Sequence, residues 1–265
     1  MIEIIKSARL ADVYRFDSNH GLNNGTGKIW YEYTSHLSSY DGEWLYGMRH
    51  GKGEMVWQNG DVYNGEWLNG KKHGLGKYTW KSGEVIDGQF QNERIHGNGK
   101  KFNAQGDPIY VGEWQNEKRH GNGKKFYSNG KPSYDGQYQN GQPHGKGKKF
   151  YESGILMYDG EWENEKWHGK GKMFYESGIL MYDGEWGNSK REGKGKEFYE
   201  SGILQYDGEW GNSKRDGKGK EFYASGNLQY DCEWKNSMKH GQGKKFYLNG
   251  TLEYEGEWEN DKSKQ

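Results

Sequence analysis

The stretch FYESGILMYDGEW, residues 150–162, decides the fold of this chain. It returns letter for letter at residues 174–186, and again at residues 198–210 with Gln205 where the preceding copy has Met181. Successive copies begin 24 residues apart, so the chain is a tandem repeat. A period of this length predicts stacked supersecondary units, each too small to bury an apolar face alone.

The most regular part of each repeat is Tyr-x-Gly-x-Trp, here termed the anchor, followed by Gly-x-Gly eleven residues after its first position. Residues at i, i+2 and i+4 share one face of an extended strand, so Tyr, Gly and Trp are predicted on one face and acidic residues on the other. Seven anchors are complete: Tyr40/Gly42/Trp44, Tyr63/Gly65/Trp67, Tyr110/Gly112/Trp114, Tyr158/Gly160/Trp162, Tyr182/Gly184/Trp186, Tyr206/Gly208/Trp210 and Tyr254/Gly256/Trp258. Three deviate: Ile86/Gly88/Phe90, Tyr134/Gly136/Tyr138 and Tyr230/Cys232/Trp234.

The Gly-x-Gly segment predicts a second strand, which makes each repeat a β-hairpin. After the anchor at Tyr158, residues 163–168 form an expected polar turn, and by parity Gly169, Gly171 and Tyr175 share the aromatic face. Glycine inside a strand is kept where a bulky group approaches the backbone, so we expect a neighbouring ring over each glycine. A lone hairpin is marginal in stability, and the hairpins must therefore stack into one long sheet.

This repeat resembles the MORN repeat family, whose consensus runs roughly YxGxW, a short turn, GxG and an aromatic pair before the next turn glycine. The resemblance covers residues 40–258, where the motif recurs ten times in register. It implies an all-β fold: an elongated, twisted, open single-sheet meander of about ten hairpins with an aromatic-lined groove. The chain is then divided into an N-terminal cap segment (1–13), a degenerate first repeat (14–39), the array (40–258) and a C-terminal tail (259–265).

Charge and composition favour a cytoplasmic protein without nucleic acid as its partner. Lys and Arg number 38, as do Asp and Glu, and a balanced chain has no general attraction to polyanions. No apolar run is long enough for a signal peptide or a membrane span. The single cysteine, Cys232, excludes an internal disulfide and fits a reducing compartment.

Neither a metal site nor a catalytic centre is expected. Seven histidines precede the Gly-x-Gly motifs: His50, His73, His96, His120, His144, His168 and His240. Successive copies stand two strands, or roughly 9.5 Å, apart, whereas ligands sharing a zinc ion must each come within about 2.1 Å of it. Every chemically interesting residue type is spread over the repeats, but an active site is a unique pocket, so catalytic residues and cofactors are predicted to be absent.

The face opposite the rings is expected to neutralise itself, with lysines on second strands beside carboxylates on first strands. Binding of anionic phosphoinositides would need lysines without partners. The doublets Lys100/Lys101, Lys124/Lys125 and Lys148/Lys149 are the candidates for this role.

A second contact patch is predicted in the later repeats, which carry one extra residue before the anchor tyrosine. By parity Leu156 joins the face of Tyr158, while Ile155 and Met157 fall on the charged face beside Phe150; a bulge at the extra residue would reverse this. The predicted patch comprises Phe150, Ile155, Met157, Phe174, Ile179 and Met181.

The leading hypothesis is a non-enzymatic scaffold that grips segments of other proteins along the aromatic groove. The predicted groove residues are Tyr40, Trp44, Tyr63, Trp67, Tyr110, Trp114, Tyr158, Trp162, Tyr182, Trp186, Tyr206 and Trp210. Similarity to stand-alone arrays such as radial spoke head proteins implies a ciliary axoneme or cytoskeletal assembly. The alternative is a peripheral membrane tether binding phosphoinositides, as junctophilin-like arrays are thought to do. An exposed apolar face is also expected to be shielded by another surface, so a homodimer is a further possibility.

Overall fold

The computed structural model describes residues 15–16, 24–33 and 36–264. The chain divides into two compact units, residues 1–130 and residues 131–265. The predicted N-terminal cap segment lies outside the described residues, as does most of the segment 14–23 that begins the degenerate first repeat.

Both units are built only of β-strands and the turns that join them, over the residues described. The first unit contains β1 (Arg15–Phe16), β2 (Asn24–Tyr33), β3 (His36–Leu45), β4 (Met48–Val56), β5 (Val62–Leu68), β6 (Lys71–Thr79), β7 (Val85–Gln91), β8 (Arg94–Phe102), β9 (Pro108–Gln115) and β10 (Lys118–Phe126). The second contains β11 (Pro132–Gln139), β12 (Gln142–Phe150), β13 (Leu156–Glu163), β14 (Lys166–Phe174), β15 (Leu180–Gly187), β16 (Lys190–Phe198), β17 (Leu204–Gly211), β18 (Lys214–Phe222), β19 (Leu228–Lys235), β20 (Met238–Phe246), β21 (Leu252–Glu259) and β22 (Lys262–Ser263).

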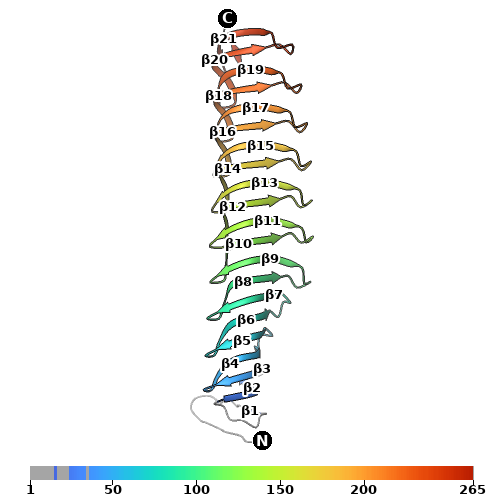
Figure 1. Ribbon diagram of the computed structural model, residues 1–265, viewed down its shortest axis with the longest axis vertical. Helices are drawn as coiled ribbons and strands as arrows, with labels where there is room; N and C mark the ends of the chain where they lie inside the picture. Colours follow the sequence, from blue (N-terminus) through green and yellow to red (C-terminus); the bar gives the residue numbers. More distant parts are fainter. Residues whose placement is uncertain (1–14, 17–23, 34–35, 265) are drawn as a thin grey trace. The chain divides into compact units, whose positions relative to one another are not determined.

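Within each unit, every strand pairs antiparallel with the strand that follows it, which gives an open meander one layer thick (Figure 1). The all-β fold of tandem hairpins is therefore confirmed. Part of the predicted C-terminal tail continues the sheet, because β22 pairs with β21 through Trp258 and Ser263.

The turn inside each hairpin is tighter than the sequence suggests. Between β13 and β14 it contains only Asn164 and Glu165, whose φ angles of 48° and 69° both lie in the left-handed region. Two-residue turns of this kind match the right-handed twist of the strands they join. The second strand therefore begins at Lys166, well before the expected end of the polar turn at residue 168.

The two glycines of Gly-x-Gly have different roles, which corrects the parity prediction. Gly171 faces Gly160 across the hairpin, and a Cβ added to it would collide with the phenol of Tyr158. Gly169 instead has a φ of 57°, and its Cβ would meet the carboxylate of Glu161 on the other face. A register shift between Gly160 and Glu161 causes this, because a bulge reverses the direction of the intervening residues.

The anchor rings form a core on one face of the sheet. The hydroxyl of Tyr158 donates to the carbonyl oxygen of Glu161 at 3.0 Å within β13. The indole of Trp162 donates to the carbonyl oxygen of Gly147 at 2.9 Å in the preceding hairpin. The two rings meet edge to face at 5.3 Å, and Trp162 meets Tyr134 in the same way at 5.2 Å. Such contacts contribute about 0.5–1.5 kcal/mol each beyond burial, so the aromatic ladder holds successive hairpins together.

The outer turns are joined from one repeat to the next as well. The hydroxyl of Tyr151 donates to the carbonyl oxygen of Phe174 at 2.8 Å, and that of Tyr175 donates to Phe198 at 2.9 Å. Tyr175 thus lies in a turn beyond the end of β14, and its side chain links neighbouring turns. In these repeats of the second unit, each hairpin is fixed along both its core and its outer end, which positions the exposed side chains at regular intervals.

Candidate functional site

The predicted groove residues form the core of the sheet. Eleven of the twelve are at most 9% exposed: Tyr40, Tyr63, Trp67, Tyr110, Trp114, Tyr158, Trp162, Tyr182, Trp186, Tyr206 and Trp210. Trp44 is partly exposed. A partner approaching this face would meet the side chains that cover the rings, and those side chains define the candidate site.

A second layer begins with the residue nine positions after each anchor's first residue, here termed the cap. The guanidinium carbon of Arg191 lies 4.9 Å from the ring centroids of both Tyr182 and Trp210. That of Arg215 lies 4.5 Å from the Tyr206 ring. For the nine anchors that precede Tyr254, the caps are Arg49, Lys72, Ile95, Arg119, Pro143, Trp167, Arg191, Arg215 and Lys239, and Ser263 holds this position after the last anchor. A cation over an aromatic face is attracted by the ring quadrupole, and most caps use this interaction.

The caps escaped the sequence analysis because they fell inside the predicted polar turn. Trp167 shows the geometry most clearly, since it pairs with Trp162 across the hairpin and stacks on Tyr158 at 4.8 Å with an interplanar angle of 10°. It also meets Trp186 edge to face at 5.0 Å. A recurrent large or cationic residue two positions before Gly-x-Gly was the available signal.

The layer is completed by the residue on the second strand of the same hairpin that pairs with the anchor's first residue. This residue is here termed the flank. The flanks are Met55, Tyr78, Lys101, Lys125, Lys149, Met173, Glu197, Glu221 and Lys245. In the second unit, Arg215 forms ion pairs with Glu221 at 2.6 Å and with Glu197 at 3.3 Å. Caps and flanks together therefore differ chemically from one repeat to the next.

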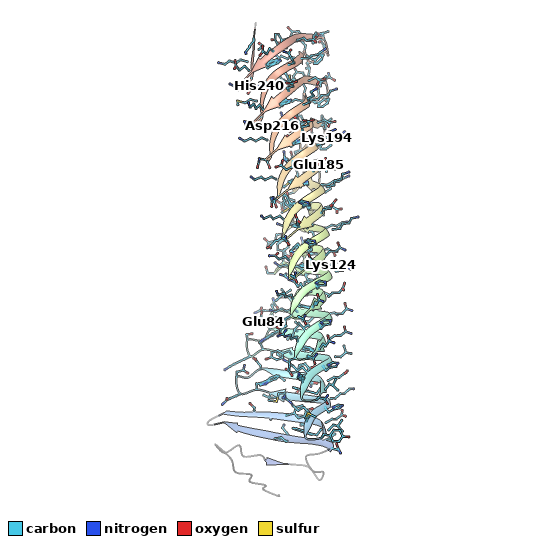
Figure 2. The ribbon with its side chains drawn as sticks, turned by 90° about the vertical axis from the view of Figure 1, so that its left-hand side faces the viewer. Glu84, Lys124, Glu185, Lys194, Asp216 and His240 are labelled. Carbon is cyan, nitrogen blue, oxygen red and sulfur yellow. The ribbon has the colours of Figure 1, made fainter. Side chains whose placement is uncertain are left out.

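The opposite face repeats one chemistry. Lys172 lies 3.4 Å from Asp183, and equivalent pairs join Lys148 to Asp159, Lys196 to Asp207, Lys220 to Asp231 and Lys244 to Glu255. Figure 2 shows Glu185 and Lys194 projecting on the same side of the second unit. Exposed pairs of this kind contribute little to stability, and they leave a face of alternating, largely compensated charge.

The lysine doublets are divided between the two faces. Lys148 pairs with Asp159 on the charged face, whereas Lys149 lies opposite Tyr158 on the aromatic face. Lys100 and Lys101 are separated in the same way, opposite Asp87 and Ile86. The two lysines of each of these doublets therefore do not share a face, because successive strand residues point to opposite sides.

The strand pairing around the predicted second patch differs from the parity prediction. Phe150 pairs with Leu156, and a register shift next to this pair leaves Met157 as the extra residue. The parity assignment of Leu156 and Met157 is thus wrong, for the reason that a bulge absorbs the inserted residue. Ile155 lies in the outer turn and is 37% exposed. The same register recurs one repeat later, where Phe174 pairs with Leu180 and not with Ile179 or Met181.

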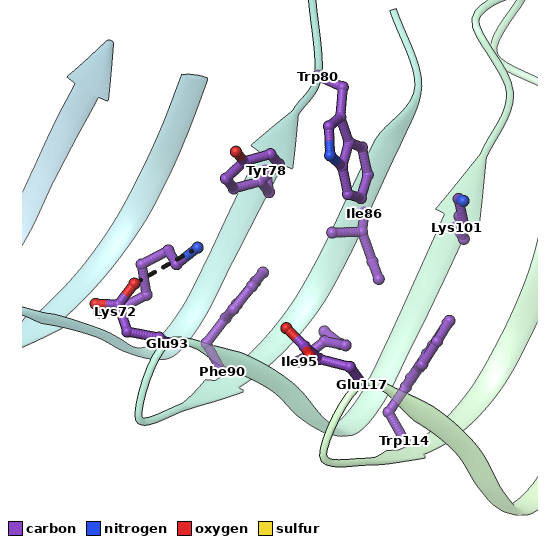
Figure 3. A pocket seen from close by; sticks show the side chains of 10 residues that line it. All are labelled: Lys72, Tyr78, Trp80, Ile86, Phe90, Glu93, Ile95, Lys101, Trp114 and Glu117. Atoms are coloured by element: carbon purple, nitrogen blue, oxygen red, sulfur yellow. Dashed lines mark hydrogen bonds and ion pairs between the residues drawn. The ribbon is translucent and has the colours of Figure 1, made fainter. Parts of the chain in front are cut away.

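A cleft of about 370 Å³ lies on the candidate face of the first unit (Figure 3). Its lining is Lys72, Tyr78, Trp80, Ile86, Phe90, Glu93, Ile95, Lys101, Trp114 and Glu117. The third anchor, in which Ile86 replaces tyrosine and Phe90 replaces tryptophan, forms its floor. The deviation is visible in the sequence, but the cleft that it creates is not.

Two lysines of the cleft already have acidic partners. Lys72 Nζ lies 3.6 Å from Glu93 Oε2, and Lys101 Nζ lies 3.6 Å from Glu84 Oε1. Burial lowers the pKa of Lys72, and the Glu93 carboxylate opposes that shift. The Lys72 ammonium also stands 4.6 Å from the Tyr78 ring centroid. The cleft thus combines apolar rings with charges that are largely matched.

Metal binding and membrane spanning find no support in the part of the chain that the structure describes. No group of three or more His, Cys, Asp and Glu side chains there could hold a metal ion. The same residues contain no helix long and apolar enough to cross a membrane.

Comparisons with known proteins agree with this architecture. The MORN repeat model matches residues 40–62, 63–85, 87–107, 110–131, 134–155, 158–179, 182–203, 206–228, 230–252 and 254–263. No curated protein sequence matches the chain. A solved streptogramin B lyase structure aligns over 93% of this chain and 88% of the lyase chain at 12% identity. The TM-score is 0.18, which shows no shared fold. Because the matched segments cover most of the chain, the protein belongs to the MORN-repeat family.

Proposed function

We propose that the protein is a non-enzymatic scaffold that binds a segment of another protein along the face formed by its caps and flanks. MORN repeats are generally scaffold modules that bind protein or membrane. The supporting observation is that a nearly constant aromatic core carries a variable second layer, whereas the opposite face repeats the same ion pairs. Only the variable face can distinguish one partner sequence from another.

The spacing of the second layer suits an extended segment. Equivalent residues in successive hairpins stand two strands, or roughly 9.5 Å, apart. An extended chain advances about 3.3 Å per residue, so every third residue of a partner would meet a new cap. In the second unit, such a segment would pass from apolar Trp167 and Met173 to the charged Arg191 and Glu197.

The setting we propose is a ciliary or cytoskeletal assembly such as the radial spoke head. This part of the proposal is supported by the resemblance to stand-alone MORN arrays. A second copy of the chain is another occupant that the face could accept. Phosphoinositide binding is the membrane alternative, and it is weakened by the ion pairs that engage lysines such as Lys172 and Lys196 on the charged face.

Affinity capture from an extract of ciliated source cells tests the proposal. The intact chain is compared with Trp167→Arg/Met173→Glu, which gives this repeat the cap and flank that Arg191 and Glu197 provide in the next one and should therefore fold. Lys172→Glu on the charged face is the matched control. Circular dichroism first verifies that all three chains are folded.

The expected result is a defined set of axonemal or cytoskeletal proteins that the intact chain and Lys172→Glu retain and the face variant loses. Equal capture by all three chains would exclude the face formed by caps and flanks as the surface that binds the partner. A chain that retains no protein but sediments with phosphoinositide vesicles would favour the membrane tether, and light scattering that shows a dimer broken by the face variant would favour self-association.

A further inference from the structure

Within the first unit, the cleft is a gap in a row of caps that is otherwise cationic. Arg49 precedes it with its guanidinium carbon 4.3 Å from the Trp67 ring centroid, and Lys72 follows over Tyr78 at 4.6 Å. Arg119 comes after the cleft, 5.9 Å from the ring of Tyr110. Between them, the cap position holds the uncharged Ile95.

The gap originates in the third anchor. In complete anchors the tyrosine ring covers the paired glycines, as Tyr63 covers Gly76. Ile86 is too short to do this, and a Cβ on Gly99 would instead meet Ile95 Cδ1 at 3.0 Å. Ile95 is only 4% exposed, so it has moved into the core to replace the missing phenol. Nothing in the described cap row then takes its place above the rings.

A carboxylate is left facing this gap. In the preceding repeat, the turn residue Glu93 accepts the backbone N–H of Lys72 at 2.8 Å and pairs with its ammonium. Asp261 likewise accepts the backbone N–H of the cap Lys239 and forms an ion pair with its ammonium at 2.9 Å. Glu117 holds the equivalent turn position, and its backbone N–H donates to the carbonyl oxygen of Ile95 at 3.2 Å.

Ile95 offers no charge to that carboxylate. Among the described residues, no basic side chain forms an ion pair with Glu117, which lines the cleft beside Trp114 (Figure 3). The lysines of the cleft are committed elsewhere, since Lys72 pairs with Glu93 and Lys101 pairs with Glu84. The cleft therefore presents aromatic surface, room for a side chain and a carboxylate that forms no ion pair, although the Lys72 ammonium attracts it from a longer distance.

We propose that this cleft receives an arginine side chain from the bound protein segment, which completes the row of caps. The guanidinium would lie against Trp80 and Trp114 and pair with Glu117. The chain itself shows that this chemistry fits such a core, because Arg49 and Arg191 lie 4.3 and 4.9 Å from tryptophan ring centroids. A planar guanidinium stacks on aromatic rings and pairs with carboxylates better than an ammonium does. The inference rests on the proposed scaffold function and names the chemistry of its partner.

The test is a titration of the full chain with the tripeptide acetyl-Gly-Arg-Gly-amide, followed by the indole N–H resonances of Trp80 and Trp114. Each resonance is assigned from the Trp80→Phe or Trp114→Phe variant. The citrulline tripeptide, which has the same shape without the charge, is the control ligand. Saturable shifts with a Kd on the order of millimolar are expected for arginine, because one side chain makes few contacts.

Two protein variants sharpen the test. Glu117→Gln should weaken arginine binding about three- to tenfold, because it removes the charge of the pair. Ile86→Tyr/Ile95→Arg restores the anchor and cap found at Tyr110 and Arg119, and should close the cleft and abolish the shifts while the chain stays folded. Equal binding of citrulline, full binding by either variant, or no saturable shift with arginine would each overturn the assignment.

The outcome is separable from that of the scaffold proposal. If the tripeptide fails while the cap face still captures its proteins, only the arginine assignment is lost. If arginine binds as expected but capture is indifferent to the cap face, the scaffold proposal fails and the cleft remains an arginine site.

Discussion

The indole N–H of Trp162 donates to the carbonyl oxygen of Gly147, 2.9 Å away in the preceding hairpin. Equivalent bonds join Trp186 to Gly171 at 3.0 Å and Trp210 to Gly195 at 3.1 Å. The bond is fully buried, and it connects residues that no local pairing within one hairpin brings together. Each tryptophan thus couples the stability of its own hairpin to that of the hairpin before it, as expected of a nearly one-dimensional array.

Trp162→Phe should destabilise the chain by about 2–4 kcal/mol, because it leaves the buried Gly147 carbonyl without its donor and removes part of the ring. The free energy of unfolding in urea measures the loss. Trp167→Phe is the matched control, since the Trp167 indole has no hydrogen bond in the structure and its ring is partly exposed. Equal losses from both substitutions would show that the Trp162 bond has no special weight.

Cys232→Gly should stabilise the chain. Cys232 occupies an anchor glycine position, and its sulfur stands over Gly243 where other repeats have the tyrosine hydroxyl. Tyr230 is accordingly partly exposed, whereas Tyr206 is fully buried. Restoring glycine would let the phenol return, and burying a large side chain contributes about 1.5–3 kcal/mol against roughly 0.5–1 kcal/mol for glycine flexibility. A net gain on the order of 1 kcal/mol is expected from thermal unfolding.

Cys232→Ala is the control for that gain, because a methyl group still blocks the phenol. If Cys232→Ala stabilises as much as Cys232→Gly, release of Tyr230 is not the cause. Burial raises the pKa of the Cys232 thiol to about 11, so alkylation in the native chain should also be slow at neutral pH and become fast on unfolding.

The sheet should lose stability steeply as pH rises above about 10. Burial raises the pKa of the anchor tyrosines Tyr63, Tyr134, Tyr158, Tyr182 and Tyr206. The unfolded chain then releases these protons at a pH where the folded chain retains them. A tyrosine whose pKa is raised by folding contributes its full stabilisation at any pH below its pKa in the unfolded chain. Above that pKa, the free energy of unfolding falls by about 1.4 kcal/mol per pH unit for each such tyrosine. Phenolate absorbance and circular dichroism should change together; phenolates that appear before the fold is lost would contradict this.

Arg215→Ala should cost about 1–3 kcal/mol, because it leaves the Glu221 carboxylate without its ion pair in a partly buried layer and leaves Glu197 with Arg191 alone. The matched charged-face change is Lys196→Ala, whose partner Asp207 is well exposed; it should cost at most about 0.5 kcal/mol. Urea unfolding at low and high salt compares them, and the Arg215 effect should depend less on salt. Equal costs would mean that the two faces hold their charges in equivalent surroundings.

Much of the architecture follows from local rules. The period of the repeat shows that the chain is an array, and parity along the anchor strand places Tyr158 and Trp162 on one face and Asp159 on the other. The same rule fails beyond Gly160, where a bulge redirects Gly169 and brings Trp167 over the rings. It fails again before Tyr158, where Met157 is absorbed by a second bulge.

The sequence by itself therefore determined the family, the hairpins and the identity of the aromatic core. Only the tertiary structure decided which residues a partner can reach. Nearly all the rings predicted to line a groove are buried, and caps assigned to a turn form a partly exposed layer above them. The physical reason is that burial of Tyr158 depends on Trp167 from its own hairpin and on Trp186 from the next. Such contacts arise from bulges and stacking, which alternation along a single strand does not encode.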